Sequence, residues 1–280
     1  MFGRPLYRPA LAPDREARLQ AQLDSATRVF EARPGDPDAL LWVGRRLAYL
    51  GHYREAIAAF TRGIALHPAD ARFYRHRGHR YITSRQFDQA ITDLQLAAML
   101  VEDKADQVEP DGQPNAAGVP LSTLQGNIYY HLGLAYFLRQ EFARAITQWQ
   151  RARELARNDD TRAAISYWLY LTFRRMGRPQ EAAELLRGIH PDLRIMENQP
   201  YYDLLRLYRG ELAPEPLLEK ARTDGQFATY GYGVASWYLL SGDTTRAESL
   251  LRRIVDGPDW AAFGYIAAEI ELERSGSQGR

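Results

Sequence analysis

The chain has 280 residues, of which 45% are hydrophobic and 25% charged, and its formal net charge is +1. This composition is that of a globular protein, and the near-zero charge argues against a general nucleic-acid or membrane-surface binder. No apolar run approaches the ~18 residues of a membrane helix, and the absence of cysteine excludes disulfides, thiolate metal sites and cysteine nucleophiles.

The first segment of the chain is rich in proline up to residue 12 and is expected to be extended. Residues 14–32 then follow a helical pattern, with Leu19, Leu23, Ala26 and Phe30 on one face. The segment Arg33-Pro-Gly-Asp-Pro37 breaks this pattern. We therefore expect residues 1–36 to form an extended start and one leading helix.

A repeated pattern begins after this break. Its first copies are Leu40-x2-Val43-Gly44-x2-Leu47 with Ala56-x3-Phe60, then Tyr74-x2-Arg77-Gly78-x2-Tyr81 with Ala90-x3-Leu94, then Tyr129-x2-Leu132-Gly133-x2-Tyr136 with Ala145-x3-Trp149. The first two copies are 34 residues apart, and a longer interval separates the second from the third. A glycine in mid-helix costs ~1 kcal/mol relative to alanine, so its recurrence indicates that a neighbouring helix approaches closely there.

The 34-residue period and the W-x2-L-G-x2-Y…A-x3-F…P pattern resemble the tetratricopeptide repeat (TPR) family. The likeness extends over most of residues 37–256, weakens after the third copy, and is to bacterial TPR proteins of unassigned role. It implies an all-α, right-handed α-solenoid of antiparallel helix pairs. The predicted organisation is 1–36 leading segment, 37–104 units 1 and 2, 105–124 acidic Pro/Gly loop insertion, 125–190 units 3 and 4, 191–256 a degenerate and a late unit, and 257–280 C-terminal capping helix and tail.

The predicted binding site is the concave face, which the first helix of each pair lines in such solenoids. Positions 2, 5 and 9 of that helix share one stripe, which is basic at first and Tyr-lined further along. The predicted partner-binding residues are Arg45, Arg72, Arg75, His79, Asn127, Tyr130, Tyr167, Arg174, Tyr202 and Arg206. Because Tyr and Arg are enriched at binding hot spots, we expect a non-enzymatic interaction scaffold that binds an acidic peptide or protein segment.

Relatives that clamp a C-terminal carboxylate use a Lys and Asn set, where this chain has Leu41, Arg45 and His76. That difference argues against this particular ligand. A second possible site contains His76, His131 and Asp111, and with His79 it offers an alternative function as a small-anion or metal binder. No motif such as HExxH supports a metal, so neither a metal nor another cofactor is predicted. Self-assembly through the ends of the solenoid is the third alternative.

The loop insertion is acidic and rich in turn residues. We consider two interpretations: it folds over the groove, with Asp111 or Glu109 pairing Arg75 or Arg77, or it is a solvated spacer. The final helix is expected over 259–273, with Glu269, Glu271 and Glu273 forming a solvated end. The N-terminus lacks the apolar core of a signal peptide, so the chain as written is expected to be soluble and cytoplasmic, or extracytoplasmic if an export signal precedes it.

Overall fold

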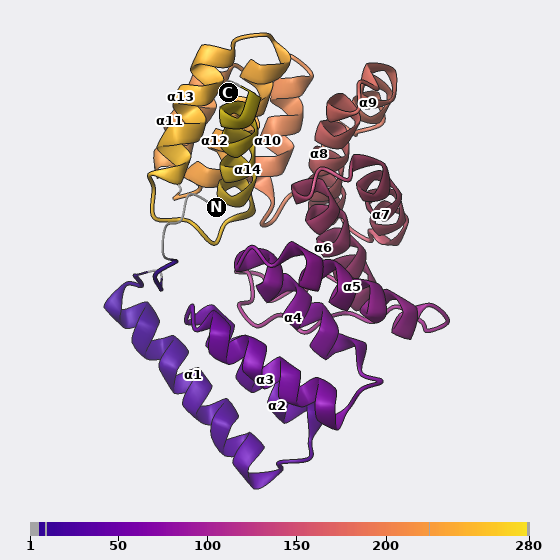
Figure 1. Cartoon of the computed structure of the whole chain (residues 1–280), viewed down its shortest axis with the longest axis vertical. Coiled ribbons are helices and arrows are strands. Elements are labelled where there is room, and N and C mark those ends of the chain that lie inside the picture. The colour runs from indigo at the N-terminus through magenta and orange to yellow at the C-terminus, as the bar shows by residue number, and fades with distance from the viewer. Residues whose placement is uncertain (1–5, 9, 224, 279–280) are drawn as a thin grey trace. The chain divides into compact units, whose positions relative to one another are not determined.

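The computed structural model describes residues 6–8, 10–223 and 225–278. Within these ranges the chain forms fourteen α-helices and no strand, and its only β-type pairing there is a single antiparallel bridge between Val108 and Thr123 (Figure 1). None of the described helices is long and apolar enough to cross a membrane. The prediction of an all-α fold built of antiparallel helix pairs is confirmed.

The chain divides into two compact units, at the boundary between residues 135 and 136. The first unit contains α1 Pro13–Ala32, α2 Pro37–Tyr49, α3 Tyr53–Leu66, α4 Ala71–Thr83, α5 Phe87–Val101 and most of α6 Leu124–Leu138. In this unit α2 packs against α3 and α4 against α5, while α1 lies against α2. The segment between α5 and α6 is the long loop.

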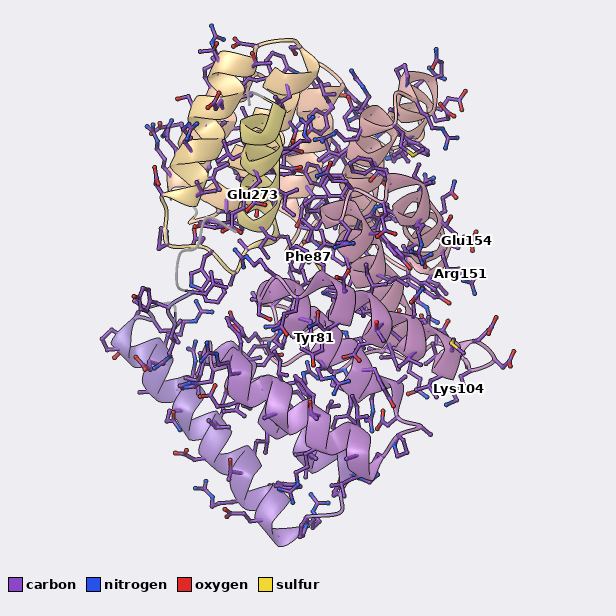
Figure 2. The ribbon with its side chains drawn as sticks, viewed as in Figure 1. Tyr81, Phe87, Lys104, Arg151, Glu154 and Glu273 are labelled. Atoms are coloured by element: carbon purple, nitrogen blue, oxygen red, sulfur yellow. The ribbon has the colours of Figure 1, made fainter. Side chains whose placement is uncertain are left out.

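The second unit has the same helix-pair construction. Its helices are α7 Phe142–Leu155, α8 Asp159–Arg175, α9 Pro179–Arg187, α10 Gln199–Tyr208, α11 Pro214–Thr223, α12 Phe227–Leu240, α13 Thr244–Val255 and α14 Phe263–Gln278. Helix α8 packs against α7, α9 and α10, and α12 packs against α11, α13 and α14. The outer face of α7 is polar, since Arg151 and Glu154 form an exposed ion pair of 2.9 Å on it (Figure 2).

Two repeat glycines occupy positions where the helices of a pair touch. A Cβ atom on Gly44 of α2 would lie 2.3 Å from Cε1 of Phe60 on α3. On Gly78 of α4 it would lie 2.8 Å from Cγ of Leu94 on α5. Both distances are far inside van der Waals contact, so the close approach predicted from the repeat is confirmed at these positions.

Local signals set the ends of several helices. Asp36 and Asp70 accept hydrogen bonds from the first backbone N–H groups of α2 and α4, which would otherwise have no intrahelical partner. Gly51 and Gly242 follow helices with φ of 81° and 84°, a left-handed conformation that glycine adopts without strain.

The prediction for the final helix is wrong in two respects. It begins at Phe263 rather than residue 259, because the preceding residues form a turn in which Ala262 N–H donates to the Asp259 carbonyl. Glu269 and Glu271 are also buried rather than solvated. Glu271 pairs with Arg175 of α8 and with Arg274. These two cationic partners compensate for the hydration that the carboxylate loses when it is buried.

Candidate functional site

The first unit contains a polar cavity of about 280 Å³ under the long loop. Its walls come from α2, α4 and α6, which are the first helices of three successive pairs, and its cover comes from the loop. The polar lining residues are Arg45, Tyr49, Arg75, His76, His79, Arg80, Glu109, Asp111, Ser122, Asn127 and His131. Four predicted groove residues and all three residues of the predicted second site therefore meet in one place.

Glu109 of the loop is the centre of this cavity. Its side chain is only 9% exposed. The Nε atom of Arg75 lies 3.2 Å from Oε2 and Nε2 of His76 lies 3.2 Å from Oε1, while Asn127 donates from Nδ2 to Oε2 over 2.9 Å. One carboxylate is thus held by groups from α4 and α6.

The backbone of the loop is held by α2. Arg45 donates to the Pro110 carbonyl over 2.7 Å, and Arg46 donates to the Gly112 carbonyl over 2.7 Å. At the base of the loop its two ends are hydrogen-bonded to each other: Glu109 N–H donates to the Ser122 carbonyl, and Leu124 N–H donates to the Gln107 carbonyl. The loop therefore crosses helices α2, α4 and α6 and contacts them through both its backbone and its side chains.

These contacts decide between the two interpretations of the loop. The predicted pair between Glu109 and Arg75 is present, so the loop folds over the groove. Arg77 instead pairs with Asp93 of α5 at 2.7 Å, and the Asp111 side chain accepts from the N–H of Gln113 within its own turn. Asp111 is exposed.

The His76 side chain connects Arg75 to Glu109. Arg75 Nη1 lies 2.9 Å from His76 Nδ1. An arginine can only donate, so Nδ1 is the acceptor, and the ring hydrogen on Nε2 points to Glu109. Burial, and then the charge of Arg75, lower the pKa of His76 to about 3, and the ring is therefore neutral at physiological pH.

The charge balance of the cavity is positive. Burial by itself raises the pKa of Glu109, but Arg75, His76 and Arg45 outweigh it and hold that pKa well below its usual range. Arg80 also lines the cavity, and burial lowers its pKa to about 10, so it remains a cation. No carboxylate among the described residues pairs with Arg80, and the buried Nε of Arg45 has no hydrogen-bond partner among them.

The histidines pack as aromatic rings. His76 stacks on Phe60 with ring centroids 5.5 Å apart, and the rings of His79 and His131 are 4.2 Å apart. His131 Nδ1 lies 2.6 Å from the Asn127 carbonyl and donates to it. No group of three His, Cys, Asp or Glu residues within the described ranges is placed to hold a metal ion. The metal alternative therefore gains no support from the geometry.

Two further predicted residues of the first unit lie outside the cavity. Arg72 is bound to Asp70 and Asp38, each at 2.6 Å, which neutralise its charge at a separate cavity of about 720 Å³. Tyr130 is partly buried on α6, edge-on to the adjacent His131 with centroids 5.3 Å apart.

Of the four predicted residues of the second unit, Tyr167 and Arg174 lie on α8, whereas Tyr202 and Arg206 lie on α10 with the guanidinium 5.9 Å from the tyrosine ring centre. Tyr167 is 1% exposed and packs beside Tyr201 and Tyr208. Tyr202 is buried, and its hydroxyl donates to the Pro191 carbonyl. Each of these tyrosines thus has a packing role.

Arginines complete that set. Arg206 forms an ion pair of 3.1 Å with Glu211. Arg174 donates to the Tyr170 hydroxyl and lines a cavity of about 510 Å³ together with Arg175 and Arg274. Glu271 pairs with the last two arginines of that cavity.

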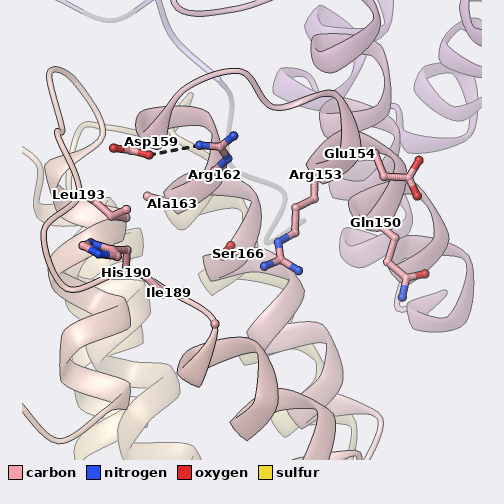
Figure 3. Close-up of a pocket in the computed structure, with 11 residues that line it drawn as sticks. Gln150, Arg153, Glu154, Asp159, Arg162, Ala163, Ser166, Ile189, His190 and Leu193 are labelled. Atoms are coloured by element: carbon pink, nitrogen blue, oxygen red, sulfur yellow. Dashed lines mark hydrogen bonds and ion pairs between the residues drawn. The ribbon is translucent and has the colours of Figure 1, made fainter.

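A cavity of about 790 Å³ in the second unit lies between α7, α8 and residues 188–193 (Figure 3). Arg153 extends into it toward Ser166. Arg162 pairs with Asp159 at 3.4 Å, whereas the Glu154 side chain points away from Arg153 and pairs with Arg151 instead.

Sequence reasoning omitted Arg46, Tyr49 and Arg80 from the site. They are one to five residues beyond Arg45 or Arg75 on the same helices, and only a wider stripe than positions 2, 5 and 9 would have included them. Glu109 entered only through the loop hypothesis, because no pattern places a loop carboxylate on a particular arginine.

No protein-family model matches the chain, and no curated protein sequence matches it. Solved structures do match. The APC/C hetero-tetramer Cut9–Hcn1 is 15% identical with a TM-score of 0.54, over 91% of this chain and 46% of that one, so the chain spans less than half of that protein. YrrB, described as a TPR protein with an unusual peptide-binding site, is 16% identical with a TM-score of 0.47, over 89% and 99% of the two chains.

A third similar structure is TTC0263, a thermophilic TPR protein of Thermus thermophilus. It is 21% identical with a TM-score of 0.46, over 69% of this chain and 90% of that one. At these identities the likeness concerns the fold alone. The repeated Gly and Ala positions, the antiparallel helix pairs and the match to Cut9–Hcn1 agree on one architecture. The chain therefore has the TPR-like fold, an α-solenoid of antiparallel helix pairs.

Proposed function

We propose that this chain is a non-enzymatic protein–protein interaction module that binds an acidic segment of a partner across α2, α4 and α6. The observation that carries the proposal is the way these helices hold residues 109–112. They bind one carboxylate and two backbone carbonyls of a peptide segment. Concave faces of helix-pair repeats generally serve as binding surfaces, and here that face has the donors that an acidic peptide requires.

The arginine chemistry supports an anionic partner. A guanidinium stays charged under all physiological conditions and presents several donors in a fixed geometry. Arg45, Arg75 and Arg80 line one cavity, whereas Glu109 is the only buried carboxylate among its described lining residues. The surplus positive charge, in a site screened from water, favours a ligand that brings carboxylates.

The histidines support binding rather than catalysis. An efficient general base has a pKa near the working pH. His76 has a pKa of about 3, and burial also lowers the pKa values of His79 and His131. Such rings act as packing surfaces and neutral donors and are poor proton shuttles at neutral pH.

A small anion is the second candidate ligand. Arg80 lines the cavity without a carboxylate partner among the described residues, and the buried Nε of Arg45 has no hydrogen-bond partner there. A free carboxylate could satisfy both groups inside about 280 Å³. A thermal-shift response to citrate or acetate that the variant below loses would favour this ligand.

The proposal is tested by capturing partners from the source lysate with matched variants. Arg45→Gln combined with Arg80→Gln removes two cavity charges. Arg18→Gln combined with Arg54→Gln removes the same charge from exposed positions of α1 and α3. We expect a partner bound by the wild type and by the surface variant and lost in the cavity variant. Equal retention by both variants contradicts the proposed groove.

A further inference from the structure

We propose that residues 109–113 are an internal ligand: they occupy the groove in place of the partner, which must displace them in order to bind. The inference rests on the proposed function and adds the regulation of the site and the chemistry of the segment that it recognises.

The loop is attached in the manner of a bound peptide rather than of a core element. Between residues 107 and 113 only Glu109 and Gly112 are buried. Val108, the one large apolar side chain of this stretch, is 52% exposed. One side-chain carboxylate and two carbonyls attach the segment to the groove helices, and the Gln113 side chain accepts one exposed hydrogen bond from Arg15 of α1. The segment therefore has little apolar burial to lose when it leaves the helices.

The base of the loop is closed independently of the groove. Val108 and Thr123 form an antiparallel bridge, and the hydrogen bonds on either side of it join Glu109 to Ser122 and Leu124 to Gln107. Residues beyond this bridge can move away from the helices while α5 and α6 remain connected. The helix pairs thus do not require the loop tip as a structural link.

When the loop leaves the groove, replacement of Glu109 by another carboxylate is more favourable than an empty groove. Departure of Glu109 leaves Arg45, Arg75 and Arg80 around one cavity without a buried counter-charge. Like charges in a poorly solvated site repel one another strongly. An incoming carboxylate relieves this repulsion, so loop and partner compete for the same arginines.

The loop also specifies what the partner segment should look like. Its anchor is a glutamate whose two oxygens reach α4 and α6. Three residues later Gly112 lies against Tyr49, where a Cβ atom would be 2.1 Å from the Tyr49 hydroxyl oxygen. A competing segment should therefore carry a glutamate followed three positions later by glycine, with a free carbonyl on the residue after the glutamate for Arg45 and on the glycine for Arg46.

The test supplies the segment as a separate molecule. In the receiving chain residues 109–122 are replaced by Asn-Gly, a two-residue turn suited to joining an antiparallel pair such as Val108 and Thr123. The probe is a fluorescent peptide of residues 107–115, blocked at both ends, and binding is measured by anisotropy. We expect it to bind the shortened chain at least about tenfold more tightly than the intact chain, because a tethered segment competes at an effective concentration in the millimolar range.

Two matched peptides identify the anchor. A peptide with Glu109→Gln should bind at least about tenfold more weakly. A peptide with Asp111→Asn loses the same charge at a position that is exposed in the structure and should bind like the parent. Equal binding of the Glu109→Gln and parent peptides overturns the assignment of Glu109 as anchor.

A second receiving chain covers the case in which the shortened one does not fold. Full-length chain with Glu109→Gln keeps the loop but weakens its hold, and we expect it to bind the parent peptide more tightly than wild type does. Absence of binding to a receiving chain with native helicity overturns the inference. That result leaves the proposed function to be decided by the capture experiment. If the peptide binds but the Arg45→Gln/Arg80→Gln variant retains the partner, the loop is still an internal ligand of the cavity, whereas the proposed function and the displacement of the loop by that partner are overturned.

Discussion

Acidification to about pH 5 is expected to destabilise the first unit through its buried histidines. Burial and neighbouring arginines lower the pKa of His76 to about 3 and hold the pKa values of His79 and His131 well below their ordinary value. In the unfolded chain all three rings titrate near 6.5. Because the folded pKa is the lower one, the unfolded state takes up protons first, and stability falls as the pH drops below about 6.5.

The size of the effect follows from the unfolded pKa alone, as long as the folded rings stay neutral. Protonating one unfolded imidazole at pH 5 stabilises the unfolded state by about 2 kcal/mol. The three rings together give about 6 kcal/mol as an upper limit. Glu109 adds little over this range, because it is ionised in the folded state and its unfolded pKa is only about 4.3.

The assay is amide hydrogen exchange of α4 and α6, which reports the opening free energy of this unit. We compare values between about pH 7 and pH 5, corrected for the intrinsic exchange rates. His131→Gln should reduce the pH dependence by about one proton. A free energy that is flat or rises toward pH 5 would refute the view that these rings are held neutral by burial beside Arg45, Arg75 and Arg80.

Three further outcomes are expected. Gly44→Ala should lower the free energy of unfolding by about 1–3 kcal/mol despite the better helix propensity of alanine, because the methyl group would overlap Phe60. Its control is Gly35→Ala, where the added Cβ atom meets no atom within 4 Å. That variant should change the free energy of urea unfolding by no more than about 0.5 kcal/mol. Glu271→Ala should lower the free energy of unfolding by about 3 kcal/mol, because it leaves Arg175 and Arg274 unpaired. The same substitution at the exposed Glu248 should lower it by less than about 0.5 kcal/mol. Equal melting temperatures of the two variants would contradict the burial of Glu271. Arg72→Ala should leave partner capture unchanged, since Asp70 and Asp38 already neutralise it; loss of the partner would place Arg72 in the binding surface.

The helix pairs could be predicted from the sequence because their signals are local and repeated. Gly44 and Gly78 recur in phase with the small and large residues of the second helices, and a helical pair brings such positions together whatever the rest of the chain does. Arg45 and Arg75 could be assigned to one face for this reason, since helical spacing fixes their direction.

The partners of those side chains were decided by the tertiary structure. Glu109 is 34 residues from Arg75 in the chain, and the path of a long loop follows from contacts at both its ends rather than from its own residues. Tyr167 satisfies the stripe rule but is buried, because a helix packed on several sides has no exposed stripe at that position. The sequence predicted a solvated Glu271, but in the structure it pairs with Arg175, which lies far from it in the chain. Periodicity specifies which residues share a helix face, and only the packing of helices against loops and one another determines what that face meets.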